Sequence, residues 1–267
     1  MLSGLRLYLH YTAVSIRSQM QYRTSFLTQT AAQLLVTGVE FLAIWALFAR
    51  FGSIGSWSLP EVAILYGMAN VAFSLADAAA RGFDTFADMV KSGDFDWLLL
   101  RPRSTALQVA GREFVMRRAG RFLQGLVVLL WGAAASGVDW TCARAALALM
   151  AILGGACLFY GILVLQATLA FWTTETLEIV NTITYGGVET AEYPLEIYRS
   201  WFRNFFTYVI PLACVNYLPA LAILGRAGPP GTRNLTGWVS PIFGLVFLLV
   251  SLGVWTVGVR HYRSTGS

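Results

Sequence analysis

The amino-acid sequence predicts an all-α integral membrane protein, in which residues 1–267 form a single transmembrane domain with six transmembrane helices. The first observation is the length of the charge-free runs, which occupy 145–174, Asn204–Gly225 and Asn234–Val259. A helix rises about 1.5 Å per residue, so about 20 apolar residues cross a hydrocarbon core roughly 30 Å thick. The second observation is composition, because 57% hydrophobic and 12% charged residues leave too little polar surface for a soluble domain of this size.

Residues 1–23 are predicted to form an interfacial helix before the first span. Apolar and polar residues recur there at helical spacing on different faces, which is typical of a helix lying in the cytoplasmic headgroup layer. The apolar face carries Leu5, Leu9, Thr12, Ile16 and Met20, and the polar face carries Arg6, His10, Arg17 and Gln21. The alternative is an ordinary cytoplasmic leader. A cleaved signal peptide is not expected, because basic residues interrupt any apolar core and no small-residue cleavage site follows.

Five transmembrane spans follow from the apolar runs. They are expected near Ser25–Ala49, Leu59–Ala80, Arg118–Val138, Arg144–Trp172 and Trp238–Val259. The first two spans contain single acids, Glu40 and Asp77, in otherwise apolar sequence. Charged side chains are costly inside a membrane. Each acid is therefore expected either to pair with a nearby arginine or to contact a substrate, and the sequence favours neither.

The position of the remaining crossing is ambiguous. Leu177–Tyr193 is weakly apolar and acidic, whereas Phe202–Leu224 is strongly apolar but is interrupted by Pro211 and Pro219. Proline kinks a helix and leaves a backbone carbonyl without its donor, which must then find a protein partner in lipid. We therefore expect Leu177–Tyr193 to be the fifth crossing and 193–225 to be a re-entrant segment of two short helices that dip in from outside. The alternative makes Phe202–Leu224 the fifth crossing and leaves Thr173–Ser200 in the cytoplasm.

The basic residues set the predicted orientation. Eight of the nineteen Lys and Arg residues lie in Arg81–Arg121, and others flank the first and last spans. Because cytoplasmic loops carry an excess of Lys and Arg, this loop and both termini are expected in the cytoplasm. The number of crossings must then be even, and the Phe51–Pro60 loop lies outside.

The cytoplasmic loop at 81–104 carries an amphipathic pattern. Phe83, Phe86 and Val90 recur at helical spacing beside acidic and basic residues, and Gly93 ends the pattern. A helix this short buries too little surface to be stable alone. We predict that it docks a cytoplasmic subunit, and the alternative is that it packs on the protein's own spans or on the lipid surface. The predicted docking residues are Phe83, Asp84, Phe86, Val90, Lys91, Asp94, Asp96 and Arg101.

Acidic residues follow one face of the predicted fifth crossing. Glu178, Asn181, Tyr185, Glu189, Glu192 and Glu196 fall at spacings of three or four residues. Exposure of this face to lipid would cost several kcal/mol, so it is expected to turn toward protein or water. The functional interpretation is a substrate path that favours cationic or amphipathic molecules, with Glu178, Tyr185, Glu189 and Glu192 along it. The alternative is a helix end that lies in water.

The sequence lacks the motifs that several classes of function require. A phosphate-binding P-loop requires a lysine after a glycine-rich turn, yet the only lysine, Lys91, lies between Val90 and Ser92, so no ATP site is expected. His10 and His261 lie at opposite ends of the chain, and the three cysteines have no metal-type spacing. No catalytic residues, metal or cofactor are therefore predicted. The net charge of +5 does not indicate nucleic-acid binding, because the basic residues lie beside the spans.

Several segments together resemble the permease subunits of type 2 ABC exporters, in particular a bacterial group of ABC transport permeases. The segments are YRTSFLTQ, GSWSLPEVAILYG, GDFDWLLLRPRS, EYPLEIYRSWFRNFFTYVIPLACVNYLPALAILGR and VRHYRSTGS, which together span nearly the whole chain. The resemblance implies a coupling helix between spans two and three, at Phe83–Lys91, and a re-entrant segment before the last span, at Tyr193–Pro219.

The resemblance also implies partners. A permease of this kind works with two cytoplasmic ABC ATPase subunits and with a second permease, the same or a related chain, in the lipid bilayer of the bacterial cytoplasmic membrane. No nucleic-acid partner is expected. The alternative function that the residues leave open is an ion-coupled carrier or channel without an ATPase, because acids inside a membrane are usually functional.

Overall fold

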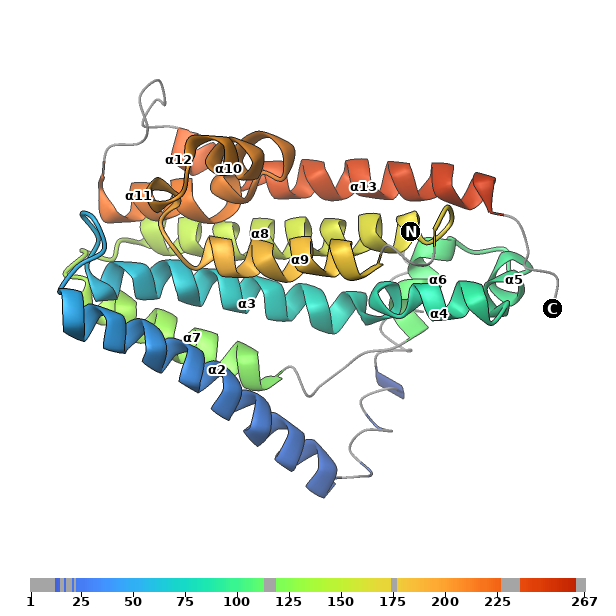
Figure 1. Cartoon of the computed structure of the whole chain (residues 1–267), viewed down its shortest axis with the longest axis horizontal. Coiled ribbons are helices and arrows are strands. Elements are labelled where there is room, and N and C mark those ends of the chain that lie inside the picture. The colour runs from blue at the N-terminus through green and yellow to red at the C-terminus, as the bar shows by residue number, and fades with distance from the viewer. Residues whose placement is uncertain are drawn as a thin grey trace.

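The computed structural model describes residues 13–14, 17, 21, 23–112, 119–173, 177–226 and 236–262, and these residues form an elongated bundle of helices (Figure 1). The described residues contain no β-strand beyond one isolated bridge between Ile54 and Trp57. The predicted all-α class is therefore confirmed. Most of the expected interfacial helix at 1–23 lies outside the described residues.

Four helices are long and apolar enough to cross a membrane. They are Thr24–Phe51, Leu59–Lys91, Cys142–Leu169 and Ile242–His261, which lie within α2 (Arg23–Phe51), across α3 (Leu59–Asp84) and α4 (Phe86–Lys91), and at α8 (Cys142–Leu169) and α13 (Ile242–His261). These helices match four of the predicted spans. The predicted third span is α7 (Ala119–Ala135), a shorter apolar helix of 17 residues.

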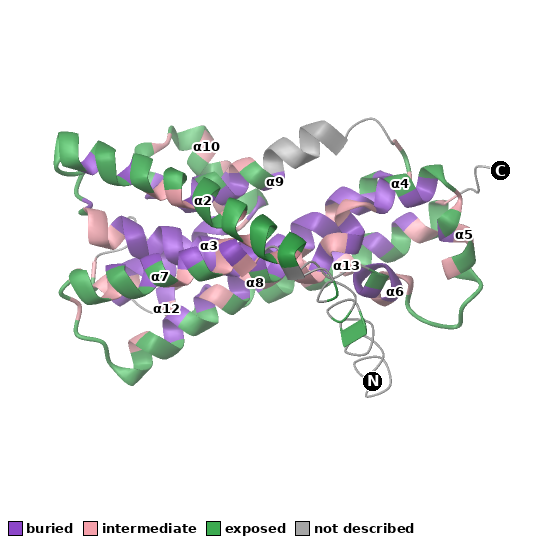
Figure 2. Cartoon of the chain, turned by 90° about the horizontal axis from the view of Figure 1, so that it is seen from below, coloured by how far each residue is buried: buried purple, intermediate pink, exposed green. Residues whose placement is uncertain are grey.

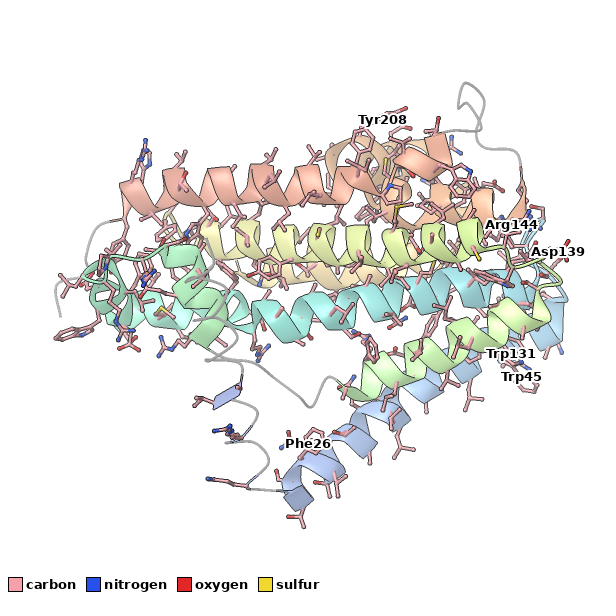
Figure 3. All side chains as sticks on the ribbon, turned by 180° about the vertical axis from the view of Figure 1, so that it is seen from behind. Phe26, Trp45, Trp131, Asp139, Arg144 and Tyr208 are labelled. Carbon is pink, nitrogen blue, oxygen red and sulfur yellow. The ribbon has the colours of Figure 1, made fainter. Side chains whose placement is uncertain are left out.

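Helix α3 is the centre of the bundle and α2 lies at its periphery. Within the most apolar window of each helix, 83% of the residues are buried in α3 but only 17% in α2, a contrast that Figure 2 shows in purple and green. The outward faces of α2 and α7 carry large apolar side chains, and Trp45 and Trp131 point away from the bundle in Figure 3. Exposed apolar surface of this extent is typical of a protein that contacts lipid.

The helices approach one another closely where glycine removes a side chain. A Cβ atom at Gly125 of α7 would lie 2.9 Å from the Cβ atom of Asn70 in α3. Where α8 and α13 meet, a Cβ atom at Gly244 would overlap the backbone of Gly154. A Cβ atom at Gly155 of α8 would lie 2.9 Å from the Cβ atom of Ala72 in α3, so α3 lies between α7 and α8, and α13 packs on the far side of α8.

The acidic and proline-rich region contains a helix and a bent pair. Helix α9 (Leu177–Ala191) runs beside α3 and α8, and a short turn, η2 (Leu195–Ile197), leads to two apolar pieces, Ser200–Val209 and Ala213–Leu224. The pieces are bent by 82°, as in a broken span or a re-entrant loop, so the described chain has four or five candidate spans. They comprise α10 (Ser200–Asn204), η3 (Phe205–Val209), η4 (Ala213–Tyr217) and α11 (Leu218–Leu224), followed by α12 (Thr236–Val239).

Short helices form the opposite end of the bundle. Helix α3 continues to Asp84, four residues past the predicted end of the span, and α4 begins at Phe86 after a break at Thr85. The expected helix at Phe83–Lys91 is therefore corrected, because Phe83 is part of the long central helix. Two further helices, α5 (Asp94–Leu99) and α6 (Thr105–Arg112), complete this end (Figure 1).

Candidate functional site

A buried polar contact joins α3 to the end of α9. Asn70 is fully buried in α3, and its Nδ2 donates to Glu192 Oε1 at 2.9 Å and to the Tyr66 carbonyl oxygen at 3.0 Å. Glu192 follows the last residue of α9 and is 6% exposed. An apolar helix such as α3 admits an amide in its interior when that amide has a polar partner, and here the partner is a carboxylate.

The same polar layer continues into α2 and α7. Gln124 Nε2 of α7 donates to the hydroxyl oxygen of Tyr66 at 3.1 Å and to the carbonyl oxygen of Thr37 at 3.3 Å. The Tyr66 hydroxyl in turn donates to the Thr37 carbonyl oxygen at 3.3 Å. Three helices are thus linked by hydrogen bonds at one level of the bundle.

Arg121 supplies the positive charge of this layer. Its Nη2 lies 3.6 Å from Glu40 Oε2, and its guanidinium carbon lies 5.3 Å from the centre of the Phe73 ring. The pairing that the sequence left open for Glu40 is therefore present. Asp77, the other single acid, is buried in α3.

A cavity of about 270 Å³ opens beside these groups, and we call it the acidic cavity. It is lined by Glu40, Ile44, Arg121, Glu189, Glu192 and Tyr193. The lining comes from α2, α7, α9 and the residues just after α9, so elements far apart in the sequence form one site. Three carboxyl groups and one guanidinium face the same space, so acidic groups outnumber basic ones in the cavity.

The structure brings together some of the predicted path residues. Glu189 and Glu192 line the acidic cavity, whereas the ring of Tyr185 packs against Phe73 with centroids 5.8 Å apart. Glu178 belongs to α9, but its side chain lies outside the described residues. Glu196 lies elsewhere, because its carboxylate accepts a hydrogen bond from the Tyr217 hydroxyl.

Sequence reasoning missed Asn70, Gln124 and Arg121 as members of this site. Asn70 and Gln124 are isolated amides within apolar runs, and that is the signal that could have found them, since an amide in a membrane helix needs a partner. Arg121 was counted among the basic residues that flank a span, although it lies inside α7.

Six aromatic side chains form a second cluster at the other end of the bundle. Phe86 lies at its centre, with ring centroids 5.1 Å from Phe95, 5.1 Å from Phe171 and 4.8 Å from Trp255. The members of this aromatic cluster are Phe83, Phe86, Phe95, Phe171, Trp255 and Tyr262. The Trp255 Nε1 also donates to Thr105 Oγ1 at 3.1 Å, which adds α6 to the assembly.

The predicted docking face is corrected by this cluster. Phe83, Phe86 and Val90 are 1%, 0% and 5% exposed, so their side chains cover the protein's own core and are not available to a partner. Of the two interpretations of the amphipathic pattern, packing on the protein's own spans is the one observed for these three residues. The apolar face packs against α8 and α13, because a six-residue helix is not stable without a packing partner.

The exposed residues of this end lie on α5 and the loop after it. Trp97 and Leu100 are 70% and 77% exposed, and Lys91 and Arg101 are exposed beside them. We call Trp97, Leu100 and Arg101 the tryptophan patch. A hollow of about 380 Å³ adjoins it, lined by Asp94, Trp97, Leu98, Arg101, Gln108, Gly111 and Arg112.

The remaining predicted docking residues are acids with partners in the chain. Asp84 pairs with Arg81, and Asp94 Oδ2 accepts from Arg112 Nη2 at 2.9 Å. Asp96 lies beside Tyr262, and burial together with this carboxylate raises the pKa of the Tyr262 phenol to about 12. These contacts fix α5 against α6 and the end of α13.

A bundle of membrane-length helices with a charged interior and an apolar exterior is typical of an integral membrane protein. The chain belongs to the family described as ABC-2 family transporter protein, which matches residues 34–266. The resemblance read from the sequence is therefore confirmed. This family provides the membrane subunit of ABC transporters, which is not itself catalytic and works with an ABC ATPase. No curated protein and no solved structure matches the chain.

Proposed function

We propose that this chain is the permease subunit of an ATP-driven exporter in a bacterial cytoplasmic membrane. The observation that carries the proposal is the family match, which extends over nearly all the described helices. Two ATPase subunits on separate chains supply the energy, and a second permease, the same or a related chain, completes the transport path. The acidic cavity opens onto that path.

The proposed topology has six crossings, formed by α2, α3, α7, α8, α9 and α13, with both termini in the cytoplasm. The region 193–225 is then a re-entrant segment that enters from outside. Two observations support this assignment. The bent pair lies at the end of the bundle where α2 ends and α3 begins (Figure 1), and Asn216 within it donates to the carbonyl oxygens of Leu65 and Ala191.

The proposed ATPase contact is the tryptophan patch together with Lys91 and the polar edge of α5. A large exposed aromatic side chain beside a basic one is typical of the anchors that dominate protein interfaces. Behind the patch, the aromatic cluster joins α4 and α5 to α8 and α13. In the proposed mechanism, closure of the ATPase pair pushes on α5, and this packing transmits the movement to the transmembrane helices.

Co-purification of the ATPase tests this proposal. Trp97→Asp places a charge at the centre of the patch, and we expect the ATPase to be lost when the permease is purified from membranes of the native host. The matched control is Trp201→Asp, which changes a side chain of similar exposure, 67% against 70%, at the other end of the bundle. Retention of the ATPase by the Trp97→Asp variant would overturn the docking surface. Complete absence of an ATPase from the wild-type complex would instead support an ion-coupled carrier.

A further inference from the structure

The acidic cavity carries a charge imbalance that the described residues do not offset. Glu40, Glu189 and Glu192 face a single guanidinium, that of Arg121. Ionised carboxylates away from bulk water must be paired, hydrogen-bonded or neutralised, because burying an isolated charge is costly. The cavity therefore favours an additional positive charge.

The polar layer beside the cavity also contains buried polar atoms without a hydrogen-bond partner among the described residues. Asn70 and Gln124 are 0% and 8% exposed, yet Asn70 Oδ1 and Gln124 Oε1 accept no hydrogen bond from any described residue. Asn70 Nδ2 donates to only one oxygen of Glu192. Buried polar atoms are normally satisfied, and Arg121 Nε is likewise a buried donor without a partner among the described residues. Because neither amide lines the cavity, the preference for a positive charge comes from the three acids that do.

The existing ion pair is loose enough to exchange partners. Arg121 Nη2 lies 3.6 Å from Glu40 Oε2, beyond hydrogen-bonding distance, and the Glu40 side chain is 43% exposed. The Arg121 side chain is 13% exposed and lies over the Phe73 ring. Arg121 is thus held by the ring, while Glu40 remains accessible to a second cation.

We propose that the acidic cavity binds the cationic head group of an amphipathic molecule, an amine or a quaternary ammonium. The volume of about 270 Å³ corresponds to roughly nine water molecules of about 30 Å³ each, which suits a head group but not a whole amphiphile. Glu40 and Glu189 are the exposed carboxylates, so the cavity opens on their side and the apolar part of the ligand extends from there into the bilayer. The ring of Tyr193 offers a further surface for the cation.

This inference names the cargo class of the exporter proposed above and so rests on that function. Its test uses the full-length chain alone in phosphatidylcholine nanodiscs, without ATPase or nucleotide. Binding of radiolabelled dodecyltrimethylammonium is measured by equilibrium dialysis and compared with that of dodecyl sulfate, which has the same alkyl chain and the opposite charge. We expect saturable binding of the cation only. Equal affinity for both amphiphiles would overturn the proposal.

Three variants assign the binding to the acidic cavity. The double variant Glu189→Gln with Glu192→Gln should lose at least about tenfold in affinity, equivalent to about 1.4 kcal/mol. Glu196→Gln removes one carboxylate close by in the chain but outside the cavity, and should bind as the wild type does. Arg121→Gln removes the competing cation and should bind more tightly. Unchanged affinity in the double variant, or weaker binding in Arg121→Gln, would refute the site.

Failure of this inference can be distinguished from failure of the proposed function. Each variant is first checked for a single monodisperse peak, and Glu189→Gln alone serves where the double variant does not fold. If the chain shows no selective binding of the cation but the Trp97-dependent ATPase association holds, only the cargo class is wrong. If the cation binds and no ATPase associates, the exporter assignment is wrong and the cavity stands.

Discussion

Asn216 connects three elements through a single side chain. It is 4% exposed in η4, and its Nδ2 donates to the Leu65 carbonyl oxygen of α3 at 3.1 Å and to the Ala191 carbonyl oxygen at 2.6 Å. Ala191 is the last residue of α9, and carbonyls at a helix end have no partner within their own helix. The amide therefore satisfies the end of α9 and fixes the bent pair against the central helix.

Asn216→Leu is expected to destabilise the protein by about 1–3 kcal/mol, because it removes two hydrogen bonds and leaves a buried carbonyl without a donor. The measurement is the thermal unfolding midpoint of the detergent-solubilised chain. Asn204→Leu makes the same replacement at an exposed position of α10 and should shift the midpoint little. Equal shifts in the two variants would mean that the hydrogen bonds of Asn216 contribute nothing.

The burial of Glu192 could be predicted from the sequence, but its partners could not. A carboxylate exposed to lipid is energetically costly, and this cost alone predicts that Glu192 faces protein. Its partner Asn70 lies 122 positions earlier, and spacing along the chain carries no information about such a contact. A pair with an arginine was one of the two expectations for Glu40, but Arg121 was not identified as that arginine, because an arginine near the start of a span resembles an ordinary cytoplasmic flank.

At the scale of helices, two glycines allow α8 and α13 to approach each other closely. Gly154 and Gly244 face each other so closely that a Cβ atom at Gly244 would overlap the Gly154 backbone. Such contacts between small residues are characteristic of helix packing in membranes, where close approach replaces the hydrophobic effect as the driving force. The two helices would have to separate to admit even a methyl group.

Gly244→Ala should therefore destabilise the chain by about 1–3 kcal/mol, the usual effect of overpacking. Gly253→Ala is the matched control in the same helix, since a Cβ atom there would meet nothing within 4 Å. The fraction of protein that remains monodisperse after heating provides the comparison. Loss of stability in Gly253→Ala alone, or no loss in Gly244→Ala, would contradict the packing argument.

The amphipathic pattern in the loop after the second span predicted the correct apolar face but not what covers it. Phe83, Phe86 and Val90 lie on one face, as their spacing indicates, and all three side chains are buried. Phe171 and Trp255, which cover Phe86, lie more than 80 residues further along the chain. The docking function assigned to that face depended on the face being free, and only the tertiary structure could test this.

For the whole molecule, contacts at the two ends are of different kinds. At the end with the 52–58 loop, Arg226 Nη2 lies 2.7 Å from Glu61 Oε1 and also donates to the Ser56 carbonyl oxygen. At the other end the contacts are mainly between aromatic rings. Arg81, Lys91, Arg101 and Arg112 lie near the aromatic end, which the positive-inside rule predicts to be the cytoplasmic one.

Cysteine labelling tests this orientation. Ser53→Cys and Ser92→Cys, both at exposed positions, are introduced after Cys142, Cys157 and Cys214 have been replaced. An impermeant thiol reagent should modify position 53 in intact cells and position 92 only after permeabilisation, because the two positions lie at opposite ends of α3. Labelling of position 92 from outside would invert the topology and remove the proposed ATPase contact from the cytoplasm.

The aromatic cluster also sets an order of events during synthesis. Phe83, Phe86 and Phe95 lie in or next to α3–α5, whereas Trp255 belongs to α13 and Tyr262 directly follows it. While the chain emerges from the ribosome, the rings near α4 have no complete set of neighbours until α13 has been made and inserted. The support beneath the tryptophan patch thus forms only after α13 has been inserted, so a folded patch reports that the helices from α3 to α13 have all been made.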